Sequence, residues 1–133
     1  MSTPCDKNRL LLVDDEPSIV RLFQIMLSAA LPKMTIDTAG NGAEAVESFE
    51  KNRPCVVLMD MHMPVMDGRQ AFKKIEELCR DRDQAMPSVI FCTGYAPSDW
   101  VKEVTAEQPC HSLLHKPVSG SDIVKTVQRF LPA

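Results

Sequence analysis

The sequence lacks the features that would direct it to a membrane or to nucleic acid. No apolar run approaches the ~20 residues of a membrane-spanning helix, and none opens the chain as a signal peptide would. Fifteen Lys and Arg against eighteen Asp and Glu give a formal net charge of −3, so a basic surface for nucleic acid is not expected. We therefore expect an intracellular, cytoplasmic protein with neither nucleic acid nor membrane among its partners.

The cysteines follow no recognisable framework. Their number, five, is odd, and no C-x-x-C pair occurs. A disulfide framework and a zinc site are therefore not expected. Cys55 and Cys92 lie inside apolar runs and are predicted to be buried, unreactive thiols. The adjacent Cys110 and His111 are expected in a solvated turn.

The composition is that of one globular domain. The chain has 133 residues, of which 44% are hydrophobic and 25% are charged, and it is long enough to bury one core. We expect a single domain over residues 1–133 with its core at about 9–131. Five apolar runs alternate with segments of helical period. The runs are Arg9–Val13, Met34–Ala39, Cys55–Met59, Ser88–Thr93 and Ser112–Lys116.

The character of the five runs predicts the order of the strands. The first, third and fourth runs are continuously apolar, as in strands of a parallel sheet covered on both faces. The second run alternates and the fifth is short and half polar, as at the edges of a sheet. Asn41, Asp67 and Ser119 are predicted N-caps of the intervening helices. The pattern predicts an α/β fold, a doubly wound (βα)5 with a five-stranded parallel sheet in the order 2-1-3-4-5.

Side chains suited to phosphoryl chemistry follow four of these strands. Asp14 and Asp15 follow the first strand, Asp60 the third, Thr93 ends the fourth and Lys116 the fifth. In an open parallel sheet, ligands bind beyond the carboxyl ends of the strands where the strand order reverses, which is here between strands 1 and 3. Convergent carboxylates need a cation, and their oxygens suit Mg²⁺. A hydroxyl and an ammonium group complete a phosphoryl-transfer site.

The residue pattern alone leaves other functions open. A metal-dependent phosphatase could use Asp60 as its nucleophile, although such sites usually place a second Asp two residues on, where this chain has His62. A flavin-binding protein of the same topology would need backbone N–H groups around a phosphate after the first strand, and the acidic residues there would repel that phosphate. Acids at this position can also simply favour the dipole of the helix that follows.

Four motifs together resemble the receiver domain of bacterial two-component response regulators. They are LLLVDDEP, VVLMDMHMPVMDG, IFCTGYA and LLHKP, and the resemblance runs from about Arg9 to Leu131. It implies a flavodoxin-like fold and a phosphoacceptor that receives its phosphoryl group from a sensor histidine kinase or a histidine phosphotransfer protein. It implies no enzymatic activity beyond the domain's own phosphorylation and dephosphorylation. A degenerate receiver that binds partners without phosphorylation is the remaining alternative.

The resemblance also implies a role for each site residue. Asp60 would be the phosphoacceptor, Thr93 would hydrogen-bond the phosphoryl group and Lys116 would pair with Asp60, with a cis bond between Lys116 and Pro117. Phosphorylation would switch the face made by the fourth helix, fifth strand and fifth helix, which would bind a downstream effector or a second copy. The implied Mg²⁺ ligands are Asp15, Asp60 and the backbone carbonyl of His62, with Asp14 bound through water.

Three positions depart from the common receiver pattern. Leu113 stands where receivers often carry an aromatic residue whose rotamer reports phosphorylation. His62 and Tyr95, two residues after the acceptor and after Thr93, are bulky enough to screen Asp60 from water. We therefore predict slow self-dephosphorylation.

Overall fold

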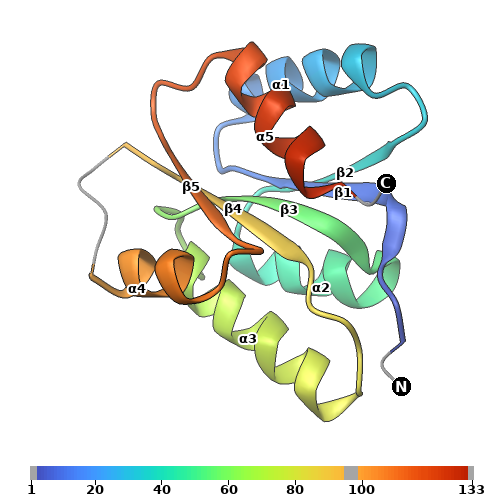
Figure 1. Ribbon diagram of the computed structural model, residues 1–133. Coiled ribbons are helices and arrows are strands. Elements are labelled where there is room, and N and C mark those ends of the chain that lie inside the picture. Colours follow the sequence, from blue (N-terminus) through green and yellow to red (C-terminus); the bar gives the residue numbers. More distant parts are fainter. Residues whose placement is uncertain (1–2, 95–98, 132–133) are drawn as a thin grey trace.

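The computed structural model describes residues 3–94 and 99–131, which form a parallel sheet with helices on both faces (Figure 1). The sheet has the order β2-β1-β3-β4-β5, so the predicted fold and strand order are confirmed. The described elements are β1 (Asp6–Val13), α1 (Pro17–Ala30), β2 (Thr35–Ala39), α2 (Gly42–Asn52), β3 (Pro54–Asp60), α3 (Gly68–Asp81), β4 (Ser88–Thr93), α4 (Asp99–Glu107), β5 (Ser112–His115) and α5 (Gly120–Phe130).

The sheet separates two hydrophobic cores. Helices α1 and α5 cover one face of the sheet, and α2, α3 and α4 cover the other (Figure 1). Successive side chains of a strand point to opposite faces, so β1 sends Leu10 and Leu12 into one core and Leu11 and Val13 into the other. Burial on both faces is the reason that the buried part of each central strand is apolar without interruption in sequence.

The buried strand β3 carries its one charged residue at its carboxyl end. All seven residues of β3 are buried, and the last of them is Asp60. The edge strands β2 and β5 are partly exposed, as their mixed composition predicts. The interior therefore fixes β3 firmly, and the rigid strand holds Asp60 at the rim of the sheet.

The predicted N-caps are confirmed. The side chain of Asn41 accepts a hydrogen bond from the backbone of Glu44, and that of Ser119 accepts one from Asp122. Asp67 forms a reciprocal capping box with Gln70 at the start of α3. None of the helices in the described segments has the length and hydropathy needed to cross a bilayer.

One cysteine prediction is wrong. Cys55 is buried, as expected, but it forms a disulfide with Cys5 rather than a free thiol. The N-terminal segment runs beside the start of β3, where the backbone N–H of Asp6 donates to the carbonyl of Arg53 at 2.7 Å. This path brings together two residues that are 50 positions apart in sequence. Cys92 is a buried free thiol, as predicted, and burial raises its pKa to about 12.

The prediction of a solvated His111 is also wrong, although Cys110 is exposed. His111 is 3% exposed. Its Nδ1 accepts a hydrogen bond from the backbone of Val89 at 2.9 Å, and its Nε2 lies 3.1 Å from Oε1 of Gln108. The ring also packs edge-on against Phe72. Burial lowers the pKa of His111 to about 4, so the imidazole is neutral at pH 7.

The disulfide predicts a measurable gain in stability. Closing a loop of this length removes conformational entropy from the unfolded chain that corresponds to about 4 kcal/mol. Cys5→Ser should therefore lower the free energy of unfolding of the oxidised protein by roughly 2–4 kcal/mol, measured by urea denaturation. The matched control is Cys110→Ser, which removes an exposed free thiol. Equal stabilities for Cys5→Ser and the oxidised wild type would contradict the pairing.

Buried His111 predicts acid sensitivity. Its pKa is about 4 in the folded state against an ordinary 6.5, so its contribution to stability is present above pH 6.5 and is lost as the pH falls toward 4. Because His111 binds a proton more readily in the unfolded chain, the free energy of unfolding should fall by about 2 kcal/mol between pH 7 and pH 5. His111→Gln should flatten this slope, whereas His115→Gln, at an exposed position, should not. Parallel pH profiles for His111→Gln and wild type would refute the assignment.

Candidate functional site

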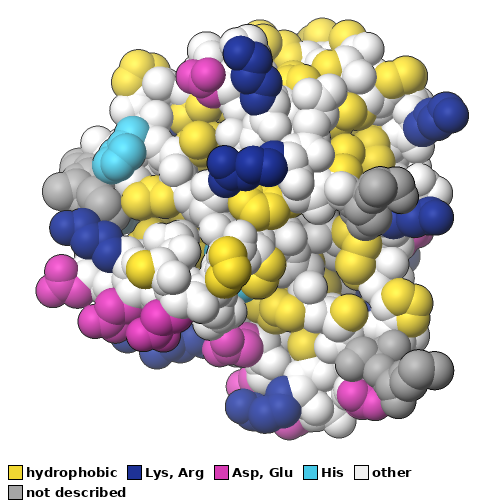
Figure 2. Space-filling model, viewed as in Figure 1, with side chains coloured by type: hydrophobic (Ala, Val, Ile, Leu, Met, Phe, Trp, Pro, Cys, Tyr) yellow, Lys and Arg dark blue, Asp and Glu magenta, His cyan; other side chains and the backbone are white. Residues whose placement is uncertain are grey.

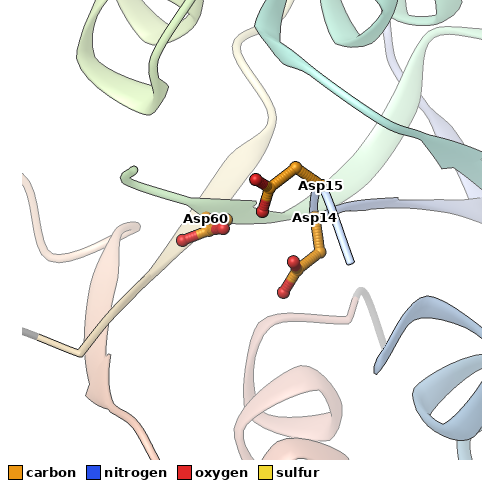
Figure 3. Close-up of side chains that lie close together, drawn as sticks. All are labelled: Asp14, Asp15 and Asp60. Atoms are coloured by element: carbon orange, nitrogen blue, oxygen red, sulfur yellow. The ribbon is translucent and has the colours of Figure 1, made fainter. Parts of the chain in front are cut away.

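Three carboxylates converge at the carboxyl ends of β1 and β3. Asp14 and Asp15 follow β1, Asp60 ends β3, and the two strands are paired neighbours, with Val13 opposite Met59. One carboxylate oxygen from each aspartate lies within 4.8 Å of the others. Figure 3 shows the three side chains gathered at this rim of the sheet. The sequence-based expectation that these residues meet is therefore correct in its geometry.

The two inner aspartates are held by the backbone around them. Asp14 is 5% exposed and Asp60 4% exposed. The backbone N–H of Glu16 donates to Oδ1 of Asp14 at 3.0 Å. The backbone N–H of His62 donates to Oδ1 of Asp60 at 3.3 Å. Asp15 is exposed, so the cluster opens to solvent on its side.

Lys116 supplies the positive charge of the site. Its Nζ lies 3.3 Å from Oδ2 of Asp14 and 3.3 Å from Oδ1 of Asp60. Its backbone N–H donates to the carbonyl of Thr93 at 2.7 Å, which ties the segment after β5 to the end of β4. The bond between Lys116 and Pro117 is cis, as the resemblance implies.

The charges in the cluster shift one another's pKa. Burial and the neighbouring carboxylate of Asp14 raise the pKa of Asp60, and the opposing effects of Lys116 and of the His62 N–H do not cancel this rise. Burial by itself would lower the pKa of Lys116, but Asp60 and Asp14 outweigh it and raise that pKa. The ammonium is therefore firmly protonated, while ionisation of Asp60 is costly unless further positive charge arrives.

Thr93 ends β4 at the same rim. Cys92 is the register partner of Asp60, so Thr93 stands one residue beyond it on the neighbouring strand, and it is buried. His62 is exposed just after β3. Tyr95 lies outside the described residues. Slow self-dephosphorylation therefore stays a prediction.

The loop between β3 and α3 is shaped by two unusual positions. A Cβ at Gly68 would lie 2.6 Å from the carbonyl oxygen of Asp60, so only glycine allows α3 to approach the acceptor strand this closely. Val65 has φ 71° and is 83% exposed. A β-branched residue is strained in this left-handed region. Sequence reasoning missed Val65, because nothing in its residue type indicates a left-handed turn.

The donor set fits Mg²⁺. Mg²⁺ prefers oxygen ligands at about 2.0–2.1 Å in an octahedron, so ligands on opposite sides of one ion are ~4.2 Å apart. The three carboxylate oxygens, all within 4.8 Å of one another, can reach one ion with small movements. A divalent cation would also offset the burial and the repulsion by Asp14 that together raise the pKa of Asp60.

Comparison with known sequences identifies the family. The sequence model of the response regulator receiver domain matches residues 10–128. The chain belongs to the receiver domain family of two-component response regulators. Phosphorylation and Mg²⁺ binding are typical of this family, which favours the receiver function over the phosphatase and flavoprotein alternatives.

Individual relatives agree with this assignment. Sporulation initiation phosphotransferase F of Bacillus subtilis is 31% identical over 128 residues, which cover 93% of this chain and 94% of that protein. Protein-glutamate methylesterase/protein-glutamine glutaminase 3 of Hahella chejuensis is 36% identical over 92 residues, or 69% of this chain. The match spans only 25% of that enzyme's length. The family thus fits a signalling role that is not enzymatic, although some relatives are enzymes.

The fold agrees as well. A response regulator receiver domain protein (CheY-like) from Methanospirillum hungatei JF-1 superposes with a TM-score of 0.77 at 22% identity, covering 93% of each chain. At this identity the likeness supports the fold alone. Its flavodoxin-like topology is the one described above.

Proposed function

We propose that this receiver domain accepts a phosphoryl group on Asp60 from the phosphohistidine of a sensor histidine kinase or a histidine phosphotransfer protein. The observation that carries the proposal is the position of Nζ of Lys116, which lies 3.3 Å from carboxylates of both Asp14 and Asp60 at the rim where the acidic residues converge. An acceptor carboxylate, a fixed cation and an acidic metal pocket are the parts that phosphoryl transfer requires.

The proposed Mg²⁺ ligands are Asp15, Asp60 and the backbone carbonyl of His62, with Asp14 acting through a water molecule. Bound Mg²⁺ supplies positive charge that neutralises the oxygens of the transferring phosphoryl group. The other contributions come from the protein. The strands hold Asp60 in place, and the backbone N–H of His62 holds Oδ1 of Asp60, which leaves Oδ2 to act as the nucleophile.

The transfer itself exchanges one bond to phosphorus for another. The ionised carboxylate of Asp60 attacks the phosphorus atom, the P–N bond to the donor histidine breaks, and the electron pair of that bond returns to the imidazole. Lys116 then releases the carboxylate and pairs with a phosphoryl oxygen. The hydroxyl of Thr93 donates a hydrogen bond to another oxygen. The domain thereby catalyses its own phosphorylation and, with water as the attacking group, its own dephosphorylation.

The switch follows from how these two residues are attached. Lys116 and Thr93 are joined by a backbone hydrogen bond between the ends of β5 and β4. A displacement of one backbone segment would therefore shift the other. The new contacts with the phosphoryl group would bias the face made by α4, β5 and α5 toward one of two arrangements. That face would bind a downstream effector or a second copy. With Leu113 half-buried against the core, the bias does not depend on an aromatic rotamer in β5.

The test is labelling by a small phosphodonor. Incubation with acetyl phosphate and Mg²⁺ should add about 80 Da, the mass of one phosphoryl group, to the wild-type protein by intact mass spectrometry. Asp60→Asn should lose this adduct because the nucleophilic oxygen is gone.

The matched control is Asp81→Asn, which changes an exposed aspartate far from the site in sequence and should be labelled like wild type. Omitting Mg²⁺ should also prevent labelling. Equal labelling of Asp60→Asn would place the acceptor elsewhere, and no labelling of a folded wild type would favour a degenerate receiver.

A further inference from the structure

A cavity of about 400 Å³ lies between α1 and α5 on the sheet face that these helices cover. Its floor is formed by Leu12, Leu58 and Cys92 of the sheet. This volume falls in the range of small-molecule pockets, about 300–1,000 Å³. An apolar cavity of about 150 Å³ is already large enough to bind benzene. The space can therefore hold a ligand larger than one benzene ring.

The two helices close this cavity in one direction. A Cβ at Gly120 would overlap the side chain of Met26, so α1 and α5 are in direct contact at this point. On α1 the lining residues Ile19, Leu22 and Phe23 all precede Met26. Leu22, on the same lining, is 50% exposed and marks the side that faces solvent. Hydrophobic side chains are visible at the surface in the region of α1 and α5 (Figure 2).

The charged residues of the cavity lining carry a net negative charge. They are Asp14, Glu16 and Lys116. The ammonium of Lys116 is already paired with Asp14 and Asp60. Glu16 is exposed and stands at the N-cap position of α1, yet its side chain makes no capping hydrogen bond. Of these three residues Glu16 is the exposed one, and its carboxylate would attract a cation.

We propose that this cavity binds a small apolar amine, with its ammonium group beside Glu16 and its hydrocarbon part among Ile19, Phe23 and Ile123, and that its occupancy slows phosphorylation of Asp60. The second half of the proposal rests on the proposed function. The first half rests only on the cavity and its charges.

The coupling arises because the cavity and the acidic site share a wall. Lys116 and Asp14 belong to both, and Pro117 and Val118 continue the lining directly after Lys116. In the structure Lys116 is paired with Asp60. A phosphoryl group on Asp60 would draw Lys116 to a new partner and reshape this wall. A ligand that fits the present wall therefore favours the unphosphorylated arrangement.

Binding is tested with three probes of equal chain length: n-octylamine, n-octanol and n-octanoate. Each is titrated into the unphosphorylated protein below its aggregation concentration, and backbone amide shifts are followed by NMR. Octylamine should give saturable shifts in residues of the cavity. It should bind roughly three- to tenfold more tightly than octanoate. The ammonium gains one exposed ion pair with Glu16, whereas the carboxylate of octanoate is repelled by it.

Two variants separate the charge from the cavity. Glu16→Gln should remove the preference for the amine while keeping the apolar contacts. Val118→Phe should fill the cavity and abolish the saturable shifts. The control is Ile25→Phe, which adds the same ring to α1 at a position that is 61% exposed and outside the lining. Should Val118→Phe fail to fold, Glu16→Gln still decides the charge preference.

The effect of the ligand on phosphorylation is tested by the initial rate of labelling with acetyl phosphate and Mg²⁺. Saturating octylamine should lower this rate by about twofold or more.

Absence of saturable shifts in the NMR titration would overturn the proposal. Equal affinities for octylamine and octanol would overturn the proposed preference for a cationic ligand. The cavity would then be a pocket for any apolar group, such as a side chain of a docking protein. Binding without a change in rate would overturn the coupling. Absence of labelling at Asp60 would instead count against the proposed function and leave the binding result standing.

Discussion

Repulsion among the carboxylates at the ends of β1 and β3 is the constraint on which the rest of the site depends. Two of these groups, Asp14 and Asp60, are almost fully buried, and burying like charges together costs free energy unless a cation compensates. The protein compensates in part with Lys116, which reaches both carboxylates. The pKa of Asp60 remains raised all the same, so the metal-free site is poised to gain positive charge.

The strand order of the fold holds the repelling carboxylates close together. Strands β1 and β3 are neighbours because the strand order reverses between them, and helices follow them onto opposite faces of the sheet. Each strand is fixed by two hydrophobic cores, so neither can move to relieve the repulsion. The hydrophobic effect thereby holds charges together that would separate in solution. The same rigidity would hold a phosphorylated Asp60 in place, so that Thr93 and Lys116 would adjust to contact its phosphoryl group.

The parts of this arrangement that depend on local pattern could be predicted from sequence. The apolar runs of β1, β3 and β4 and the mixed runs of β2 and β5 specify the sheet order. The aspartates at the ends of β1 and β3 then specify the acidic rim, since the carboxyl ends of parallel strands share one edge. The Cys5–Cys55 disulfide, the burial of His111 and the left-handed Val65 could not be predicted. Each depends on how segments distant in sequence pass one another or on a backbone angle that the residue type disfavours.

The most direct test compares the unfolding free energies of wild type and Asp60→Asn with and without Mg²⁺. Asp60→Asn should be the more stable protein without metal, because the raised pKa of Asp60 means that its ionised form is disfavoured in the fold. Mg²⁺ should stabilise the wild type more than the variant. A variant less stable than wild type without metal, together with an equal gain from Mg²⁺ in both proteins, would show that the carboxylates do not form a cation-dependent site.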